Sequence, residues 1–195
     1  MEQILGRKGR AGHDGNQYTP NNSASVVVYP SIFHPKPNQS MSNFIAPGST
    51  APTLQVTDQE GTAKTLSDFN GKKLVVFFYP KANSGSCTKE AVSLKDAYPE
   101  LQSLGYEVVG VSPDKTRALQ NFINKHELPY SLLSDPNNEL TKAFGAWGEK
   151  KMYGKVYDGL LRTTFLLDEK GVVTHVIEKV KSATHGDQVL EAIKA

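Results

Sequence analysis

One cysteine, Cys87, occurs in the 195 residues of the chain. A disulfide within the chain and the chemistry of a dithiol oxidoreductase are both excluded, because each needs two cysteines. Low cysteine usage is typical of a reducing compartment, and the residues near Met1 show no apolar core of a secretory signal. We therefore expect a cytoplasmic protein in which Cys87 is the only candidate cysteine nucleophile.

Long apolar runs and paired histidine spacings are missing as well. The longest uninterrupted apolar stretch, residues 74–79, is far shorter than the roughly 18 residues that span a bilayer, so we expect no membrane segment. The five histidines are scattered without the spacing of a zinc site. We interpret each as a surface or packing residue and expect no metal.

The N-terminal 40 residues differ in composition from the rest of the chain. They are rich in Gly, Asn, Ser and Pro and show no amphipathic period, which predicts a disordered extension ahead of a domain over residues 41–195. A targeting segment is the alternative, because acidic residues are sparse there. Four basic and two acidic residues in this segment account for the whole net charge of +2. So few charges give only non-specific attraction to nucleic acid, and we expect no nucleic-acid partner.

From Pro52 onward, strand patterns alternate with helical patterns. The run at 73–79 is apolar at nearly every position, which predicts a central strand in a sheet covered on both faces. A short antiparallel pair is expected around the turn at 58–61. The other predicted strands are 106–111, 130–133, 162–167 and 172–178, and the predicted helices are 86–104, 116–126, 138–144 and 185–194. This alternation is typical of a three-layer α/β domain with a central mixed sheet flanked by helices, and the thioredoxin-like fold is the natural candidate.

Cys87 lies at the junction between the predicted central strand and the helix that follows it. Pro80 ends the strand, a Gly/Ser-rich turn at 83–86 follows, and Cys87 falls in the first turn of the helix. The free N–H groups and the positive end of the helix dipole favour an anion at that position, and therefore the reactive thiolate. The alternative is a small buried apolar residue, the commoner role of a lone cysteine. The strand–turn–helix junction favours the reactive role.

The residues around Cys87 resemble a known family signature. The segment 78–91 is similar to the pattern Pro-x-x-x-(Thr/Ser)-x-x-Cys of the peroxiredoxins, in the form used by the bacterioferritin-comigratory (peroxiredoxin Q) branch. Further blocks at 128–135, 147–155 and 162–168 extend the resemblance over nearly all of 41–195. The segment from Met41 resembles the ordinary beginning of this family, so an upstream extension and a start-site assignment error both stay open for residues 1–40.

The resemblance implies peroxide reduction without a metal or an organic cofactor. Cys87 would attack a hydroperoxide and become a sulfenic acid. Ser84 would hydrogen-bond the thiolate or the peroxide, and Pro80 would shield the sulfur from water. Arg162 would favour the thiolate and stabilise the departing oxygen, while Glu90 would orient the guanidinium group. Each residue has a structural alternative: a helix cap for Ser84, a strand end for Pro80, and an ordinary ion pair for Arg162 and Glu90.

Two features of the sequence depart from the family pattern. Gly85-Ser86 stands where many members have Pro-Gly, and glycine in place of proline loosens the turn. The commonest resolving cysteine of this branch lies five residues after the first, where this chain has Val92. No other cysteine can take its place, so we expect a one-cysteine cycle in which an external thiol (thioredoxin, glutaredoxin or glutathione) reduces the oxidised Cys87. We expect a monomer or weak dimer. The alternative is a catalytically weakened thioredoxin-fold module that senses redox state or binds a partner.

Overall fold

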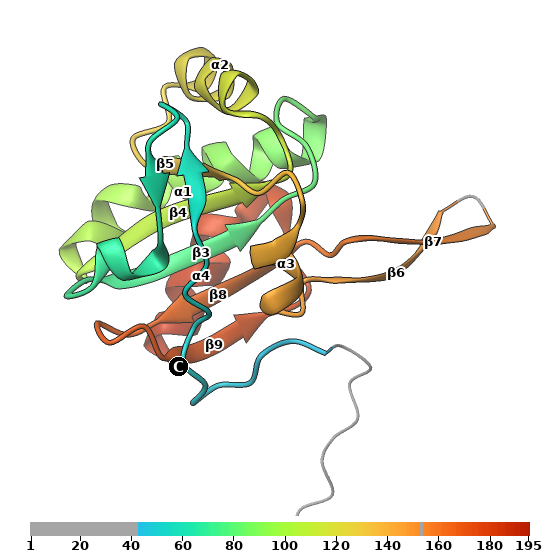
Figure 1. Cartoon of the computed structure of the whole chain (residues 1–195). Helices are drawn as coiled ribbons and strands as arrows, with labels where there is room; N and C mark the ends of the chain where they lie inside the picture. Colours follow the sequence, from blue (N-terminus) through green and yellow to red (C-terminus); the bar gives the residue numbers. More distant parts are fainter. Residues whose placement is uncertain (1–42, 153) are drawn as a thin grey trace, which may run out of the picture. The chain divides into compact units, whose positions relative to one another are not determined.

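The computed structural model describes residues 43–152 and 154–195 (Figure 1). The chain divides into two units, Met1–Gln39 and Ser40–Ala195, and every described residue belongs to the second. The extension predicted for residues 1–40 lies outside the described residues. Within them, no helix is long and apolar enough to cross a membrane.

A seven-stranded mixed sheet forms the centre of the described unit, with the strand order β2-β1-β5-β4-β3-β8-β9. Strand β3 pairs in parallel with β4 and antiparallel with β8, and β5 pairs in parallel with β4. The strands of this sheet are β1 (Val56–Asp58), β2 (Ala63–Lys64), β3 (Lys73–Phe78), β4 (Tyr106–Ser112), β5 (Ser131–Ser134), β8 (Thr163–Leu167) and β9 (Val173–Ile177).

Helices cover both faces of this sheet, as Figure 1 shows. The α-helices are α1 (Gly85–Ser103), α2 (Thr116–His126), α3 (Glu139–Ala143) and α4 (His185–Lys194), and the 3-10 helices are η1 (Leu66–Phe69) and η2 (Ser182–Thr184). Alternate side chains of β3 point to opposite faces, so Val75 and Phe77 pack with α1, α2 and α4. Val76 and Phe78 pack with α3 and η1 on the other face. The expected three-layer α/β arrangement is confirmed.

Most of the predicted elements occur close to their predicted positions. Helices α2 and α4 have the predicted bounds, and β3 is a central strand with residues 74–78 buried. The antiparallel pair expected around the turn at 58–61 is present as β1 and β2. The largest element that the sequence pattern did not reveal is a hairpin of β6 (Trp147–Met152) and β7 (Lys155–Leu160), which forms a separate two-stranded sheet.

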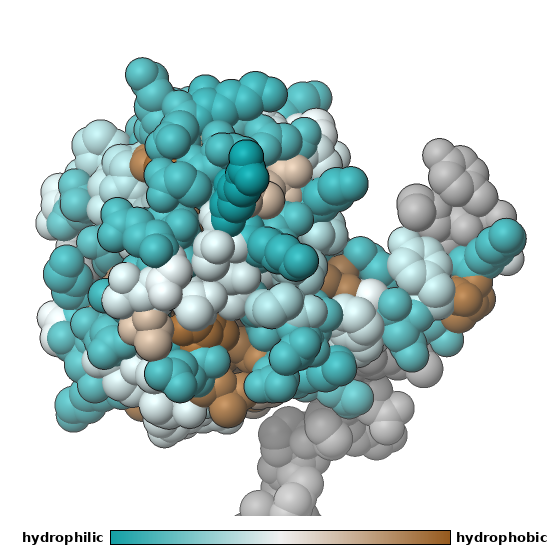
Figure 2. Space-filling view, turned by 45° about the horizontal axis from the view of Figure 1, so that its top comes forward, coloured by the Kyte–Doolittle hydropathy of each residue, from teal (hydrophilic) through white to brown (hydrophobic). Residues whose placement is uncertain are grey.

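The hydrophobic pattern of the sequence does not reveal this hairpin, because few of its residues pack against the core. Residues 155–158 of β7 are exposed, so its sequence does not need the apolar alternation that marks a half-buried strand. Figure 1 shows the hairpin projecting beyond the sheet. The face of the molecule seen in Figure 2 is mostly hydrophilic, with hydrophobic residues gathered in small areas.

Candidate active site

Cys87 occupies the position that the sequence predicts, in the first turn of α1 just beyond the end of β3. The chain reverses between them through Asn83, whose backbone is left-handed at φ 58°. Ser84 is the N-cap residue, with an extended backbone that leads into the helix, and its carbonyl accepts a hydrogen bond from Thr88 N–H at 2.9 Å. The Cys87 side chain is fully buried. The thiol therefore lies at the positive end of a 19-residue helix and out of water.

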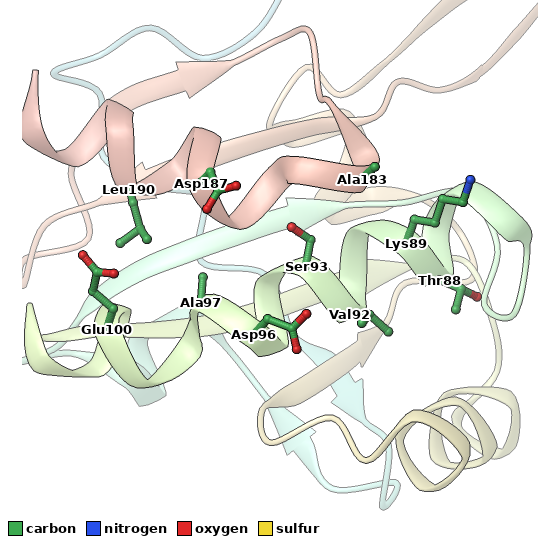
Figure 3. Close-up of a pocket in the computed structure, with 10 residues that line it drawn as sticks. All are labelled: Thr88, Lys89, Val92, Ser93, Asp96, Ala97, Glu100, Ala183, Asp187 and Leu190. Carbon is green, nitrogen blue, oxygen red and sulfur yellow. The ribbon is translucent and has the colours of Figure 1, made fainter.

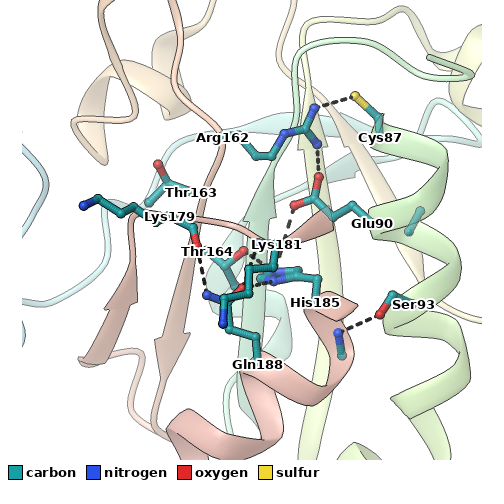
Figure 4. Close-up of polar contacts among 12 residues, drawn as sticks. Cys87, Glu90, Ser93, Arg162, Thr163, Thr164, Lys179, Lys181, His185 and Gln188 are labelled. Carbon is teal, nitrogen blue, oxygen red and sulfur yellow. Dashed lines mark hydrogen bonds and ion pairs between the residues drawn. The ribbon is translucent and has the colours of Figure 1, made fainter. Parts of the chain in front are cut away.

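Arg162 contacts this thiol from a different element of the fold. It directly precedes β8, whose pairing with β3 places Thr163 opposite Phe78 at the carboxyl end of the central strand. Its Nη2 donates a hydrogen bond to Cys87 Sγ at 3.2 Å, and its Nη1 donates one to Glu90 Oε2 (Figure 4). One guanidinium group thus bridges the sulfur and a carboxylate that come from the same face of α1.

Glu90 is a fully buried carboxyl group, which is uncommon for this residue type. Burial raises the pKa of Glu90 from 4.5 to about 7, although the charge and hydrogen bond of Arg162 oppose the rise. Near neutral pH the carboxyl group therefore exists in both protonation states. The charge beside Arg162 changes with pH in the same range.

Pro80 and Arg162 line one side of an open groove of about 850 Å³. Trp147 and Leu161 add apolar surface to it, and Lys150 adds a second cation near Arg162. Burial lowers the pKa of Lys150, and the nearby charge of Arg162 lowers it further. The guanidinium group that contacts the thiol thus lines the groove, whereas the buried Cys87 is not among the residues that line it.

The five candidate residues from the sequence differ in how closely they contact Cys87. Cys87, Glu90 and Arg162 are in direct contact, and Pro80 lines the groove beside Arg162. Ser84 is half-buried at the start of α1, and its side chain makes no capping hydrogen bond. The position of the hydroxyl thus leaves it available for a partner other than the helix backbone.

A buried histidine that the sequence analysis assigned only to surface or packing extends the network. His185, the first residue of α4, is fully buried, with Nε2 2.8 Å from Thr164 Oγ1 and Nδ1 3.1 Å from Gln188 Oε1. Its Nε2 also lies 3.9 Å from Glu90 Oε1. Burial lowers the pKa of His185 to about 4, although its hydrogen bond with Gln188 opposes the change.

Gly186 explains how this histidine comes so close to α1. A Cβ atom on Gly186 would lie 2.4 Å from the carbonyl oxygen of Ser93 and 2.7 Å from Ala97 Cβ, so only glycine permits the contact between the two helices. The Gly186 N–H donates to Ser93 Oγ at 2.9 Å (Figure 4). A histidine followed by glycine is a weak signal in a sequence, because its meaning depends on a helix about 90 residues earlier.

Val92 lies away from Cys87, on a different side of α1. It lines a groove of about 610 Å³ between α1 and α4, together with Ser93 and Asp187 (Figure 3). Cys87 belongs instead to the buried core on the sheet side of the helix. The position expected for a resolving cysteine therefore carries a half-buried valine that has no redox chemistry.

The mixed sheet, the flanking helices and a buried cysteine held by arginine at a helix N-terminus define the class of thioredoxin-like thiol enzymes. Residues 47–176 match the model of the AhpC/TSA family, so the chain belongs to that family. Peroxiredoxin Bcp of Escherichia coli is 41% identical over 152 residues, which are 78% of this chain and 97% of that protein. A putative peroxiredoxin of Haemophilus influenzae is 40% identical over 153 residues, 78% of this chain and 99% of its own length.

Solved structures lead to the same branch of the family. The bacterioferritin comigratory protein of Xanthomonas campestris is 37% identical with a TM-score of 0.69, covering 78% of this chain and 97% of that one. The peroxidoxin BcpB of Mycobacterium tuberculosis is 31% identical with a TM-score of 0.67, covering 77% and 97%. The resemblance to the bacterioferritin-comigratory branch and the thioredoxin-like fold expected from the sequence are both confirmed.

Proposed function

We propose that this protein is a thiol-dependent peroxidase that reduces hydrogen peroxide and organic hydroperoxides through Cys87. The observation that carries the proposal is the hydrogen bond from Arg162 Nη2 to Cys87 Sγ, made at the N-terminus of α1 in a member of the AhpC/TSA family. A fixed cation and a helix N-terminus both stabilise a thiolate. A buried setting strengthens both effects, because little water is present to screen them.

The first step joins the sulfur to one oxygen of the peroxide. The Cys87 thiolate attacks that oxygen, the S–O bond forms as the O–O bond breaks, and the other oxygen leaves as water or an alcohol after it takes up a proton. The sulfur is oxidised to a sulfenic acid and the peroxide is reduced. Arg162 faces the sulfur and can hydrogen-bond the negative charge that develops on the departing oxygen. Ser84 and Pro80 complete the proposed site, with Ser84 as a donor and Pro80 as a wall.

The second step requires a thiol from another molecule, because Cys87 is the only cysteine in the sequence. That thiol attacks the sulfenic sulfur, water leaves, and a mixed disulfide forms, which a further thiol reduces. Glutathione, glutaredoxin and thioredoxin are the candidate reductants. Because Cys87 is fully buried, we propose that the first turn of α1 opens before the mixed disulfide forms.

The groove beside Arg162 supports organic hydroperoxides as substrates. Its apolar surface includes Pro80, Trp147 and Leu161, which suits an alkyl group. The relative from Xanthomonas campestris has alkyl peroxide reduction activity. We further propose an antioxidant role in cytoplasmic redox homeostasis for a monomer or weak dimer whose domain spans residues 41–195.

The proposal is tested by rapid mixing of the reduced protein with hydrogen peroxide and with an alkyl hydroperoxide. We expect one thiol per chain to disappear with one equivalent of peroxide, much faster than free cysteine reacts, and mass spectrometry to place the product on Cys87. Addition of each candidate thiol then shows which one removes the modification. C87S, as the control, should stay folded and react with neither peroxide. A thiol that reacts no faster than free cysteine would exclude the proposal.

A second candidate function is a redox sensor or partner-binding module without turnover. It is motivated by Val92, by the Gly85-Ser86 turn and by the full burial of Cys87, which restricts access of an external thiol. Peroxide would then oxidise Cys87 once and the product would persist. Sustained peroxide consumption with any of the three candidate reductants rejects this candidate.

A further inference from the structure

One oxygen of the buried Glu90 carboxyl group has no hydrogen-bond partner among the residues that the structure describes. Glu90 Oε2 accepts from Arg162, whereas the buried Oε1 is unsatisfied among the described residues. Leaving a charged oxygen unpaired in the protein interior is costly, so a proton or a donor is expected at this atom. His185 Nε2, 3.9 Å away, is a polar group that can share a proton with this oxygen after a small side-chain movement.

Gln188 determines which nitrogen of His185 carries a hydrogen. The Gln188 Oε1 accepts a hydrogen bond from the backbone N–H of Lys181 at 3.0 Å, and its Nε2 donates to the carbonyl of Lys179 at 2.9 Å. These two backbone groups fix the orientation of the amide, so the atom that faces His185 Nδ1 is an acceptor. Nδ1 must therefore carry a hydrogen. In a neutral imidazole, Nε2 is then an unprotonated acceptor.

This tautomer leaves Glu90 Oε1 without a hydrogen-bond donor from His185 when the imidazole is neutral and the carboxyl group is ionised. The hydroxyl of Thr164, 2.8 Å from Nε2, donates its hydrogen to that nitrogen. A neutral His185 therefore has no hydrogen to offer Glu90 Oε1. A proton on Nε2 lets the imidazolium ion donate to Oε1, and a proton on Oε1 lets Glu90 donate to Nε2 once the Thr164 hydroxyl turns away from that nitrogen. A second proton would leave two donors facing each other.

We propose that His185 is a positioning residue of the peroxidase site, which shares one proton with Glu90 and so controls how much of the Arg162 charge acts on Cys87. With the proton bound, Glu90 is neutral or paired with an imidazolium ion, and the guanidinium charge is available to the sulfur. When the proton leaves to water, the carboxylate compensates Arg162 and the thiolate loses part of its stabilisation. This inference rests on the proposed function and concerns the regulation of the same site.

The surroundings of the pair support proton sharing near neutral pH. Burial raises the pKa of Glu90 and lowers the pKa of His185, so both effects favour a neutral pair. The titratable and charged groups that face the network come from α1, β6, the start of β8 and the segment before β5: Cys87, Lys150, Arg162 and Tyr130. Arg162 opposes a proton on either group, whereas burial favours a protonated Glu90 and a deprotonated His185, which places the shared proton chiefly on Glu90.

The ring nitrogens of His185 give a direct test in the unmodified protein. Nitrogen-15 spectra of the reduced protein should show the Nδ1–H tautomer, with an Nε2 resonance that titrates near neutral pH. In E90Q the tautomer should persist and the titration should disappear. An Nε2–H tautomer, or a titration that is unchanged in E90Q, would overturn the proposal.

The effect on the thiol is measured by the rate of Cys87 alkylation by iodoacetamide across pH. In H185Q the glutamine offers an N–H to Glu90 at every pH and cannot take its proton, so Glu90 stays ionised over a wider range. We expect alkylation below the midpoint to slow by about threefold, which equals a shift of about half a pH unit in the midpoint. H175Q, on the exposed side of β9, is the matched control and should behave as the wild type.

A double-mutant cycle separates positioning from a general structural effect. If His185 acts through Glu90, H185Q should change the alkylation profile in the wild type and leave it unchanged in the E90Q background. An equal change in both backgrounds, or none in either, would overturn the proposal. Alkylation does not depend on peroxide, so this result stands apart from the test of peroxidase activity. Loss of peroxide reactivity with an intact cycle would reject only the proposed function.

Discussion

Ser84 begins a helix without using its hydroxyl as a cap. It occupies the N-cap of α1, yet its hydroxyl makes no capping hydrogen bond. A capping serine usually stabilises its helix by about 1 kcal/mol through that bond. The structural alternative for Ser84 therefore has no support from its contacts, and the hydroxyl lies three residues before the reactive thiol.

Replacement of Ser84 separates catalysis from stability. We expect S84A to slow the reaction of Cys87 with peroxide by roughly 10-fold to 100-fold, because one hydrogen bond to a charged reacting group is lost. The free energy of unfolding in urea should change by less than about 0.5 kcal/mol, since no cap is removed. S84T, which keeps the hydroxyl, should react at nearly the wild-type rate. A stability loss with an unchanged peroxide rate would show that Ser84 only caps the helix.

Arg162 is the residue on which the whole arrangement depends, because its guanidinium group contacts both the sulfur and Glu90. A planar fork of N–H donors can face two acceptors at once, which a lysine ammonium group on a flexible stem does less well. The arginine also keeps its charge at every pH relevant to the protein. The variable charge in the network is therefore that of Glu90 and His185.

At the scale of elements, the first turn of α1 decides how well the thiol is held. Gly85 begins the helix, and a Cβ atom there would meet nothing within 4 Å. Proline suits the first position of a helix, where the N–H has no intrahelical partner, and the Ser84 backbone (φ −77°, ψ 150°) is the conformation that proline requires before it. Glycine therefore leaves the backbone at position 85 more conformational freedom than proline would, although the site can accommodate proline.

Gly85→Pro should therefore stabilise the protein. We expect the free energy of unfolding to rise by about 0.5–1 kcal/mol, mainly because the unfolded chain loses conformational freedom. Chemical denaturation followed by circular dichroism measures the change. Gly105→Pro is the matched control: Gly105 has φ 81°, which proline cannot adopt, so that variant should be destabilised. A loss of stability in Gly85→Pro would mean that the Gly85 N–H has a partner in the folded protein.

The contact between α1 and α4 is the second element-scale feature of the site. Gly186 permits the close approach that brings His185 from the C-terminal helix to within 3.9 Å of Glu90. The same helix pair frames the groove that contains Val92. One packing arrangement thus determines both the polar network behind the thiol and the surface that replaces the usual resolving cysteine.

At the scale of the whole molecule, the Glu90 and His185 network affects stability as well as reactivity. The pKa of Glu90 rises on folding from 4.5 to about 7, so the folded state holds the extra proton and this carboxyl group lowers stability as pH rises through that window. The pKa of His185 falls from 6.5 to about 4, so the unfolded state holds the extra proton and this imidazole raises stability as pH rises. The two contributions cancel between about pH 4.5 and 6.5.

Removal of one partner should expose the contribution of the other. In E90Q, His185 is the only member of the pair that titrates. The free energy of unfolding of this variant, relative to that of the E90Q/H185Q double variant, should rise by up to about 3 kcal/mol between pH 4 and 6.5. The wild type, compared with the same double variant, should show little change between pH 4.5 and 6.5. Urea denaturation at closely spaced pH values measures all three proteins. Parallel profiles for E90Q and the double variant would show that His185 does not titrate with a lowered pKa.

Local sequence information was sufficient for the elements that have a strong apolar period and for the residues near Cys87. The apolar run of β3 predicts a buried central strand, the amphipathic pattern of α2 predicts its bounds, and the spacing of three residues puts Glu90 on the same side of α1 as the thiol. Patterns of this kind reflect burial within a single element, so neighbouring residues are enough to reveal them. The cysteine count alone excludes a second thiol within the chain, and the proposed cycle therefore takes that thiol from another molecule.

Only the tertiary structure decided which distant residues meet at the thiol. The pairing of β8 with β3 delivers Arg162 to Cys87, and the packing of α4 on α1 delivers His185 to Glu90. The family resemblance implied the arginine, but no local pattern marked the histidine, since its partners lie on two other elements. Contacts between residues far apart in the chain depend on the shape of the whole core, and this is why the charge network behind the single cysteine emerges only from the folded molecule.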